Sequence, residues 1–139
     1  MVVARRWIFV LAGLASTLAL AAVAAEPPDW NAVKDLDTVS VATTNPDGTL
    51  RYTTVWLVVV DGRGYIRTGD TTWGANVVRA PNVTLVIDDR EYALRVDFVE
   101  AEDERALVMA AFNAKYGWQD TMFGWFRGAR PKIMRLASL

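Results

Sequence analysis

Residues 50–68 read LRYTTVWLVVVDGRGYIRT and indicate two strands joined by a turn. Their threonines, valines and aromatic residues are typical of strands, and Asp61-Gly62-Arg63-Gly64 is a tight-turn sequence between two such runs. We therefore predict a long strand over Thr49–Val60 that forms a hairpin with a shorter strand over Tyr65–Thr68.

Further strands are predicted on both sides of this hairpin. Thr38–Thr44 has the composition of a strand, and Asn45-Pro46-Asp47-Gly48 turns it back onto Thr49–Val60, because Pro presets φ and Gly accepts a positive φ. The first three strands therefore form an antiparallel meander. A second hairpin consists of Asn82–Ile87, the turn Asp88-Asp89-Arg90 and Glu91–Glu100, and Lys132–Ala137 is a candidate final strand.

Helical spacing predicts short helices over Trp30–Leu36 and Trp73–Arg79, and a longer helix from Asp103 to Gly117. The capping candidates are Asp29 for the first helix and Thr71 or Thr72 for the second. The predicted apolar stripe of the long helix consists of Ala106, Leu107, Ala110, Ala111, Ala114 and nearby aromatic residues.

These elements together indicate a mainly β protein with helices, of the α+β class. Five or six antiparallel strands, with one short helix after the third strand and one longer helix late in the chain, fit a small barrel with helices that plug or flank it.

The composition excludes most familiar kinds of active site. The 139 residues contain no histidine and no cysteine. This excludes Ser-His-Asp and Cys-His nucleophile systems, thiolate redox centres, disulfides, and the usual His or Cys ligation of zinc, copper, haem and iron–sulfur clusters. Catalysis would have to use carboxylates, hydroxyls, Arg, Lys and aromatic rings, a hard-metal oxygen site, or a cofactor with its own reactivity.

The first 25 residues have the pattern of a targeting segment. Arg5 and Arg6 form a cationic start, residues 7–20 are apolar, and Ala22-Val23-Ala24-Ala25 offers the small residues that a signal peptidase accepts. We predict a signal peptide that is cleaved after Ala24 or Ala25.

Cleavage would leave one domain, residues 26–139, in the periplasm or outside the cell. The alternative is a membrane anchor formed by residues 7–25, in which case the protein contacts a membrane. Arg5-Arg6 before Trp7-Ile8-Phe9 also leaves open a twin-arginine route, which exports folded proteins.

The charge of the exported part predicts no nucleic-acid partner. Without residues 1–25 the chain has 13 basic and 16 acidic residues, a net charge of −3. Its acidic clusters lie at a turn and at a helix start, where acids favour the helix dipole, so we expect no metal site. They consist of Asp88, Asp89 and Glu91, and of Glu100, Glu102, Asp103 and Glu104.

Aromatic and basic residues gather near the end of the chain. Such clusters are most often core or dimer contacts, and the alternatives are a lid over a cofactor or a contact with a membrane surface. The segment contains Trp118, Phe123, Trp125, Phe126, Arg127, Arg130 and Lys132.

Three stretches together resemble one protein family. LRYTTVWLVVVDG (50–62), GYIRT (64–68) and RAPNVTL (79–85) are similar to the split β-barrel flavin-binding superfamily, which includes pyridoxamine 5′-phosphate oxidases and deazaflavin-dependent reductases. The Arg-x-x-Thr-Val-Trp strand and AFNAKYG (111–117) are most similar to a bacterial group of unassigned function. The resemblance covers roughly residues 36–117. It implies a small antiparallel split β-barrel, a flavin mononucleotide (FMN) or deazaflavin cofactor, and a homodimer with cofactor sites between its subunits.

The resemblance also implies cofactor-binding residues. Arg51 stands at the family's strand arginine, Thr53, Thr54 and Trp56 where the strand passes the isoalloxazine, Arg67 and Thr68 at a phosphate-binding pair, and Thr71 or Thr72 at a loop serine. By residue type alone, Trp56 would instead be a core residue, and Arg51 and Arg67 would be solvated strand residues.

Two departures from the family bear on function. Trp73 stands where a lysine normally follows the loop serine, so a phosphate charge is lost. Either Arg67, Arg51 or Arg79 compensates, or Trp73 closes the pocket to phosphorylated flavins. The family's substrate-contacting arginines and histidines near the C-terminus have no match, so pyridoxamine phosphate oxidation itself is not expected.

Three functions follow as alternatives. The first is a flavin- or deazaflavin-dependent oxidoreductase that acts on a small molecule, in which the cofactor performs the chemistry. The second is a module that binds a small ligand or flavin without turnover. The third is an exported structural or interaction domain of the same fold.

Overall fold

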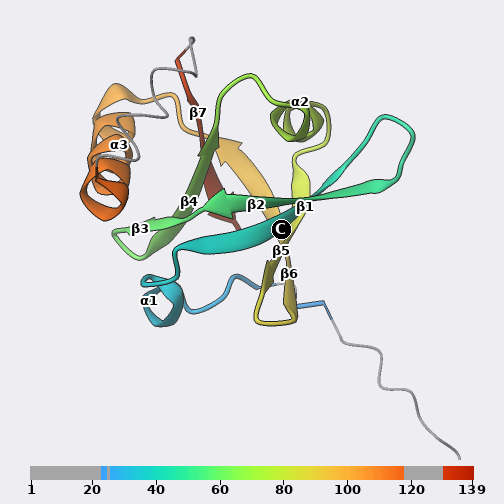
Figure 1. Ribbon diagram of the computed structural model, residues 1–139, viewed down its shortest axis with the longest axis horizontal. Helices are drawn as coiled ribbons and strands as arrows, with labels where there is room; N and C mark the ends of the chain where they lie inside the picture. Colours follow the sequence, from blue (N-terminus) through green and yellow to red (C-terminus); the bar gives the residue numbers. More distant parts are fainter. Residues whose placement is uncertain (1–22, 25, 118–129) are drawn as a thin grey trace, which may run out of the picture.

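The computed structural model describes residues 23–24, 26–117 and 130–139. Its strands form one antiparallel sheet in the order β2-β1-β5-β6-β7-β4-β3. Figure 1 shows α1 and α2 at opposite ends of this curved sheet and α3 beside it. The strands are β1 (Thr38–Thr44), β2 (Leu50–Trp56), β3 (Val58–Val60), β4 (Arg63–Thr68), β5 (Asn82–Ile87), β6 (Arg90–Phe98) and β7 (Lys132–Ala137); the helices are α1 (Trp30–Val33), α2 (Thr72–Arg79) and α3 (Glu102–Tyr116).

The long strand predicted over Thr49–Val60 is divided at Leu57. Before this residue, β2 pairs with β1 up to the partners Thr38 and Trp56, and after it β3 pairs with β4 from Val58 onward. Consecutive segments therefore lie at the two ends of the strand order. This break gives the sheet seven strands instead of five or six, and it brings the two edges together as a split barrel.

Other predicted elements agree closely with the structure. β1, β5 and β7 have the predicted bounds. The turn between β5 and β6 uses Asp88 and Asp89, whose φ angles are 48° and 62°, while Arg90 already belongs to β6. Asp89 and Asp88 thus adopt the left-handed conformation that a two-residue hairpin requires. The first helix ends at Val33 instead of Leu36.

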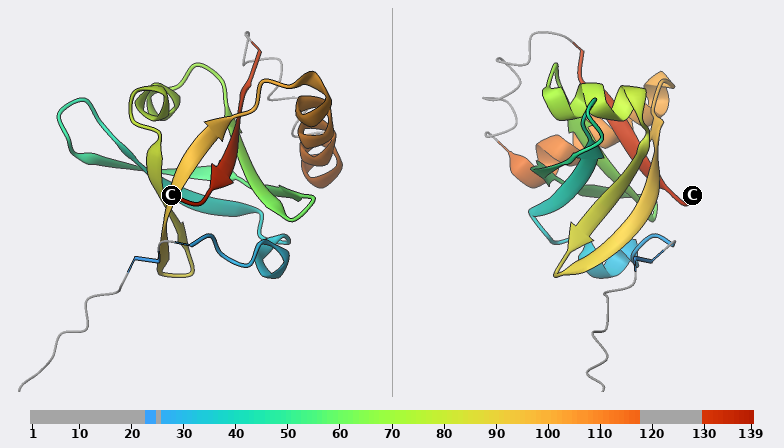
Figure 2. Two further views of the ribbon diagram at one scale, coloured as in Figure 1. Left: turned by 180° about the vertical axis from the view of Figure 1, so that it is seen from behind. Right: turned by 90° about the vertical axis from the view of Figure 1, so that its right-hand side faces the viewer.

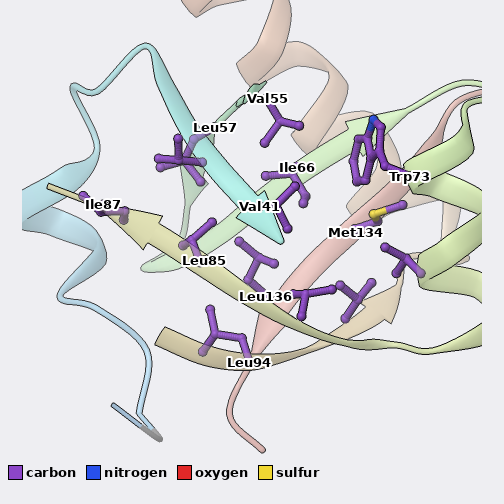
Figure 3. Close-up of a cluster of buried hydrophobic side chains, with 14 of the residues drawn as sticks. Val41, Val55, Leu57, Ile66, Trp73, Leu85, Ile87, Leu94, Met134 and Leu136 are labelled. Atoms are coloured by element: carbon purple, nitrogen blue, oxygen red, sulfur yellow. The ribbon is translucent and has the colours of Figure 1, made fainter. Parts of the chain in front are cut away.

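The barrel interior is filled by side chains that alternate along the strands and by one tryptophan from each end. Trp30 of α1 and Trp73 of α2 are both 8% exposed and belong to the same cluster as Val41, Leu85 and Leu94. Figure 3 shows Trp73 among these buried side chains. At the α1 end, Gly64 is required because a Cβ there would lie 2.4 Å from the Trp30 ring.

The predicted apolar stripe of α3 is mostly wrong. Leu107 is 57% exposed, and the predicted alanines at 106, 110 and 114 are also exposed. The buried face instead carries Arg105, Val108 and Phe112, of which Val108 and Phe112 pack on β3, β4 and β7. Alanine does not indicate which face of a helix is buried, because small residues tolerate either environment. The larger side chains fill the space over the sheet.

Ala24, in the segment before α1, forms a β-bridge with the sheet. Ala24 N donates to Glu91 O at 3.0 Å, and Ala93 N donates to Ala24 O at 2.8 Å. This isolated bridge lies on β6 before the point where β6 begins to pair with β7, at Arg95. Figure 2 shows the chain passing from there beneath the barrel to α1.

Candidate functional site

The nine residues that the resemblance implies are divided between two sides of the barrel wall. Successive side chains of a strand point to opposite faces. On β4, Thr68 therefore faces α2, while Arg67 faces α3, so the structure does not bring these two side chains together. On β2, Arg51 and Thr53 share the face of Val55, and Thr54 shares the opposite face with Trp56.

Hydroxyl groups join β4 to the beginning of α2. Thr68 Oγ1 lies 2.6 Å from Thr71 Oγ1, and Thr71 Oγ1 accepts a hydrogen bond from Gly74 N at 3.1 Å. Of the two predicted caps, Thr71 is the N-cap, and Thr72 is the exposed first residue of the helix. A Cβ on Gly74 would lie 2.7 Å from Thr68 Cγ2, so glycine permits this close approach.

Trp73 points into the barrel core and leaves the start of α2 without the family's lysine charge. A different cation lies close to this point. Lys132 pairs with Thr68 across the sheet, and its Nζ is 3.2 Å from Asp70 Oδ1. A lysine from β7 therefore stands next to the loop that precedes α2.

A pair of amide side chains, which we call the amide bridge, joins the β1–β2 hairpin to α2. Asn76 is only 1% exposed, and its Nδ2 donates to Asn45 Oδ1 at 2.9 Å and to Thr43 Oγ1 at 3.2 Å. Two arginines attach to the bridge: Arg51 Nε donates to Asn45 Oδ1 at 3.4 Å, and Arg79 Nη2 donates to Asn76 Oδ1 at 3.2 Å and to Thr44 O. Both arginines are exposed, and neither forms an ion pair within the described residues.

On the α3 side, Arg67 is buried, so the interpretation of a solvated arginine is wrong for it. Arg67 is 7% exposed. The guanidinium carbon lies 4.1 Å from the centre of the Phe112 ring, and Nη1 lies 3.3 Å from Met109 Sδ. A cation over an aromatic face is stabilised by the ring quadrupole.

Trp56 is half-buried and stacks on the last residue of α3. The Trp56 and Tyr116 rings are 4.2 Å apart and nearly parallel, at 5°. Tyr116 Oη accepts a hydrogen bond from Leu57 N at 3.0 Å and donates to Asp37 O at 2.6 Å. Burial raises the pKa of Tyr116 to about 12, so the hydroxyl is protonated at neutral pH and able to donate.

β2 is an edge strand over most of its length. Within the described chain it forms a ladder only with β1, so one side of its backbone has no strand partner. Arg51 and Thr54 are exposed beside this edge, and Thr53 is half-buried. The edge thus combines main-chain donors and acceptors with hydroxyl, aromatic and cationic side chains.

A separate polar network holds α3 against the sheet. Arg135 Nη2 contacts Glu104 Oε2 at 2.7 Å, and Tyr65 Oη donates to Glu104 Oε1 at 2.8 Å. The Arg135 guanidinium holds the pKa of Glu104 below its usual value, because its hydrogen bonds favour the carboxylate. Burial raises the pKa of Tyr65.

Other sequence-based candidates lie outside this region. Over residues 23–24, 26–117 and 130–139, no three acidic side chains are arranged to hold a metal ion, and no helix is long and apolar enough to cross a membrane. Of the C-terminal aromatic and basic segment, only Arg130 and Lys132 are described, and they pair with Glu102 and Asp70. Residues 118–129, with the segment's aromatic side chains, and residues 1–22 and 25 lie outside the described part.

Three contributors to this region were missed from the sequence. Asn76 had no distinguishing signal, because a lone asparagine in a short helix is usually exposed. Tyr116 belonged to the quoted AFNAKYG stretch, but its contact with Trp56 depends on tertiary packing. Lys132 was grouped with the aromatic segment, and only the pairing of β7 with β4 places it beside Thr68.

Comparisons with solved structures find the same fold in proteins of low sequence identity. HutZ of Vibrio cholerae, described as a heme storage protein, has a TM-score of 0.60 and 14% identity, covering 74% of this chain and 82% of that one. An F420-H2 dependent reductase, FDR-A, has a TM-score of 0.55 and 16% identity, covering 73% and 94%. A putative pyridoxamine 5′-phosphate oxidase of Listeria innocua has a TM-score of 0.54 and 15% identity, covering 76% and 86%.

No curated protein matches the chain in sequence. A family model described as an uncharacterized protein conserved in bacteria (DUF2255) matches residues 29–136. The chain therefore belongs to this bacterial family, on the split β-barrel fold of the pyridoxamine 5′-phosphate oxidase-like and deazaflavin-dependent reductase-like proteins.

Proposed function

We propose that this protein is an exported binder of a flavin, such as FMN, or of a deazaflavin, and that it uses the bound ring for oxidoreduction of a small molecule. The observation that carries the proposal is the edge of β2. There an unpaired backbone edge is flanked by Arg51 and Thr53 on one face and by Thr54 and Trp56 on the other. A flat heteroaromatic ring needs such edge hydrogen bonds beside an apolar surface.

The residues present fit the ring better than the phosphate. Trp56 offers an aromatic surface, and the β2 backbone and Thr54 offer polar partners for the ring edge. A bound flavin or deazaflavin would supply hydride or electron transfer, which suits a chain without histidine or cysteine. The protein's own contribution would be to bind and orient the ring.

Two groups of cations could bind a phosphate in place of the family lysine that Trp73 replaces. Lys132 stands beside Thr68 and Thr71, although Asp70 already pairs with it. Arg51 and Arg79 are the second source, because both have guanidinium N–H groups beyond those that contact the amide bridge. A ligand with a phosphate would bind one of these two places.

A binding module without turnover is the second candidate. It is favoured by the burial of Trp73, which leaves the start of α2 without the cation that phosphorylated flavins meet in the resembling family. A haem-binding function has less support, because haem iron is usually held by His or Cys and the chain has neither.

We further propose a homodimer that uses the outer face of β1, β2 and β5. Leu50 and Tyr52 are 56% and 60% exposed there, and no described helix covers this part of the sheet. Such exposed apolar residues are typical of association surfaces. Sedimentation of the wild type as a dimer and of Tyr52→Asp as a monomer would support this, whereas a monomeric wild type at tens of micromolar contradicts it.

The decisive experiment is a spectrum of the protein purified from its native compartment and after addition of FMN, riboflavin or F420. We expect a bound-flavin or deazaflavin absorbance and a raised melting temperature. Arg51→Ala should weaken binding about tenfold, the loss of one charge-assisted hydrogen bond. If micromolar cofactor leaves both the spectrum and the melting temperature unchanged, the proposal fails.

The same preparations locate the phosphate and test the export. Tighter binding of FMN than of riboflavin would indicate a phosphate contact. Loss of that difference in Lys132→Ala points to the start of α2, and loss in Arg79→Ala points to the amide bridge. Mass spectrometry of the secreted protein should give Ala25 or Glu26 as its first residue; a chain that keeps residues 7–25 would instead support the anchor.

A further inference from the structure

We propose that Tyr116 is a positioning residue that fixes the orientation of Trp56, and that a ring bound at the β2 edge depends on Tyr116 through Trp56. The binding of a ring at the β2 edge is part of the proposed function, and this inference rests on it. The placement of Trp56 by Tyr116 is argued independently, from contacts between α3 and the break between β2 and β3.

The backbone at the strand break is held by side chains. Leu57 lies between the β1–β2 ladder, which ends at Trp56, and the β3–β4 ladder, which begins at Val58. Its N–H donates to Tyr116 Oη at 3.0 Å, and its C=O accepts from Lys115 Nζ at 2.8 Å. The last turn of α3 therefore supplies the partners that a continuous strand would have supplied.

The same tyrosine also holds the adjacent side chain. Trp56 comes directly before Leu57, and its ring is stacked on Tyr116 at 4.2 Å and 5°. One residue thus restrains both the backbone that follows Trp56 and the ring of Trp56. Removing the stacked ring would leave the indole a wider choice of orientation.

Tyr116 is itself firmly placed. Its hydroxyl donates to Asp37 O at 2.6 Å, and the neighbouring Lys115 Nζ donates to Lys34 O at 3.0 Å and to Leu36 O. Burial lowers the pKa of Lys115. These bonds tie the end of α3 to the connection between α1 and β1, so Tyr116 forms a fixed support instead of following Trp56.

Phe112 connects Tyr116 to Arg67, the second candidate cofactor-binding residue on the α3 side. Phe112 lies one helical turn before Tyr116, with ring centres 6.0 Å apart, and its face carries the Arg67 guanidinium. The two residues of α3 thus contact both Trp56 and Arg67. Of these two residues, Tyr116 is the one whose hydroxyl contacts Leu57 at the strand break.

A double-mutant cycle in flavin affinity tests the inference. Tyr116→Leu should weaken FMN or riboflavin binding about tenfold in the wild-type background, because the indole against which the ring would stack loses its support. In the Trp56→Ala background the same change should have no further effect, because the residue through which it acts is gone. An equal loss in both backgrounds, or no loss in the first, would overturn the proposal.

Two variants separate positioning from general destabilisation. Tyr116→Phe keeps the ring, so flavin binding should stay within about threefold of the wild type. Tyr92→Leu removes a half-buried tyrosine that packs against the barrel core, so it should lower the melting temperature without changing flavin affinity. If Tyr92→Leu weakens binding as much as Tyr116→Leu, Tyr116 has only a structural role.

A measurement without ligand keeps the inference separate from the proposed function. The near-UV circular dichroism signal of Trp56 is obtained by subtracting the spectrum of Trp56→Phe from that of the wild type. We expect Tyr116→Leu to remove most of this signal, and Tyr116→Phe and Tyr92→Leu to retain it. If Tyr116→Leu does not fold, a lost Trp56 signal in folded Tyr116→Phe overturns the role of the ring, and a retained signal supports it. A wild type that binds no flavin would refute the proposed function but leave this test intact.

Discussion

The arginine side chains on the two sides of the barrel wall differ in exposure. On the α2 side, Arg51 and Arg79 are exposed and donate hydrogen bonds to the neutral amides of the half-buried Asn45 and the buried Asn76. On the α3 side, Arg67 is buried over Phe112 beside Trp56 and Tyr116. The difference shows that position on a strand does not decide whether an arginine is solvated; the element packed over that face does.

This contrast gives each side a different role. An exposed arginine that is oriented by an amide retains N–H groups for an anion, whereas a buried arginine mainly serves packing and local charge. We therefore expect changes at Arg67 and the ring beneath it to cost more stability than changes at the exposed arginines, which should affect ligand binding more than folding. Four predictions test this, in order of decreasing effect on the free energy of unfolding.

Phe112→Ala should have the largest effect. Phe112 is fully buried and supports both Arg67 and Tyr116, so its removal should lower the free energy of unfolding by about 3–5 kcal/mol. Urea denaturation measures this. Leu107→Ala on the exposed side of the same helix is the control and should change it by less than about 0.5 kcal/mol. Equal losses would show that α3 does not pack through Phe112.

Asn76→Ala should cost about 2 kcal/mol, because it removes the hydrogen bonds to Thr43, Asn45 and Arg79 from a buried site. The exposed Asn113→Ala serves as the comparison. Combining Asn76→Ala with Phe112→Ala should give additive losses within about 0.5 kcal/mol if the two sides are energetically separate. A coupling above 1 kcal/mol, roughly, would contradict that separation.

Glu104→Gln should cost about 1 kcal/mol at neutral pH, since a partly exposed ion pair contributes modestly. Because the folded state lowers the Glu104 pKa, its stabilisation is full above the ordinary value of 4.5 and is lost as the pH falls further. The variant should therefore lose less stability than the wild type as the pH falls below 4.5. Glu102→Gln, at a highly exposed pair, should follow the wild-type curve.

Arg51→Gln should have the smallest effect on folding, below about 0.5 kcal/mol, because its one hydrogen bond to the described residues is a long one to Asn45 at the surface. Thermal unfolding measures this directly. A loss above 1 kcal/mol, roughly, would mean that Arg51 holds the hairpin to α2, and the contrast between the two sides would then fail.

The sequence predicted local structure well where one residue type determines it. The strands over 38–44, 82–87 and 132–137, the Thr71 cap and the Gly117 helix end all follow from local chemistry. The break at Leu57 was not predictable, because its backbone partners come from side chains 58 and 59 residues away in the sequence. Local composition gives no information on such contacts.

The arrangement of the candidate site residues could not be predicted from the sequence. The family resemblance implied Arg51, Trp56 and Arg67, yet the division between two faces required knowing which helix covers which strand. The stripe of α3 failed for the same reason, since the alanines carry little information on direction. Asn76 and Lys132 became visible only when distant strands and helices met.

The bridge at Ala24 bears on the order of events during maturation. Two main-chain hydrogen bonds tie this residue to Glu91 and Ala93, next to the peptide bonds at which we expect a peptidase to cut. A protease must bind its substrate as a free extended strand, so pairing with β6 competes directly with cleavage. Processing would then have to precede the docking of this segment, and a precursor allowed to fold first should be cut more slowly than one presented unfolded.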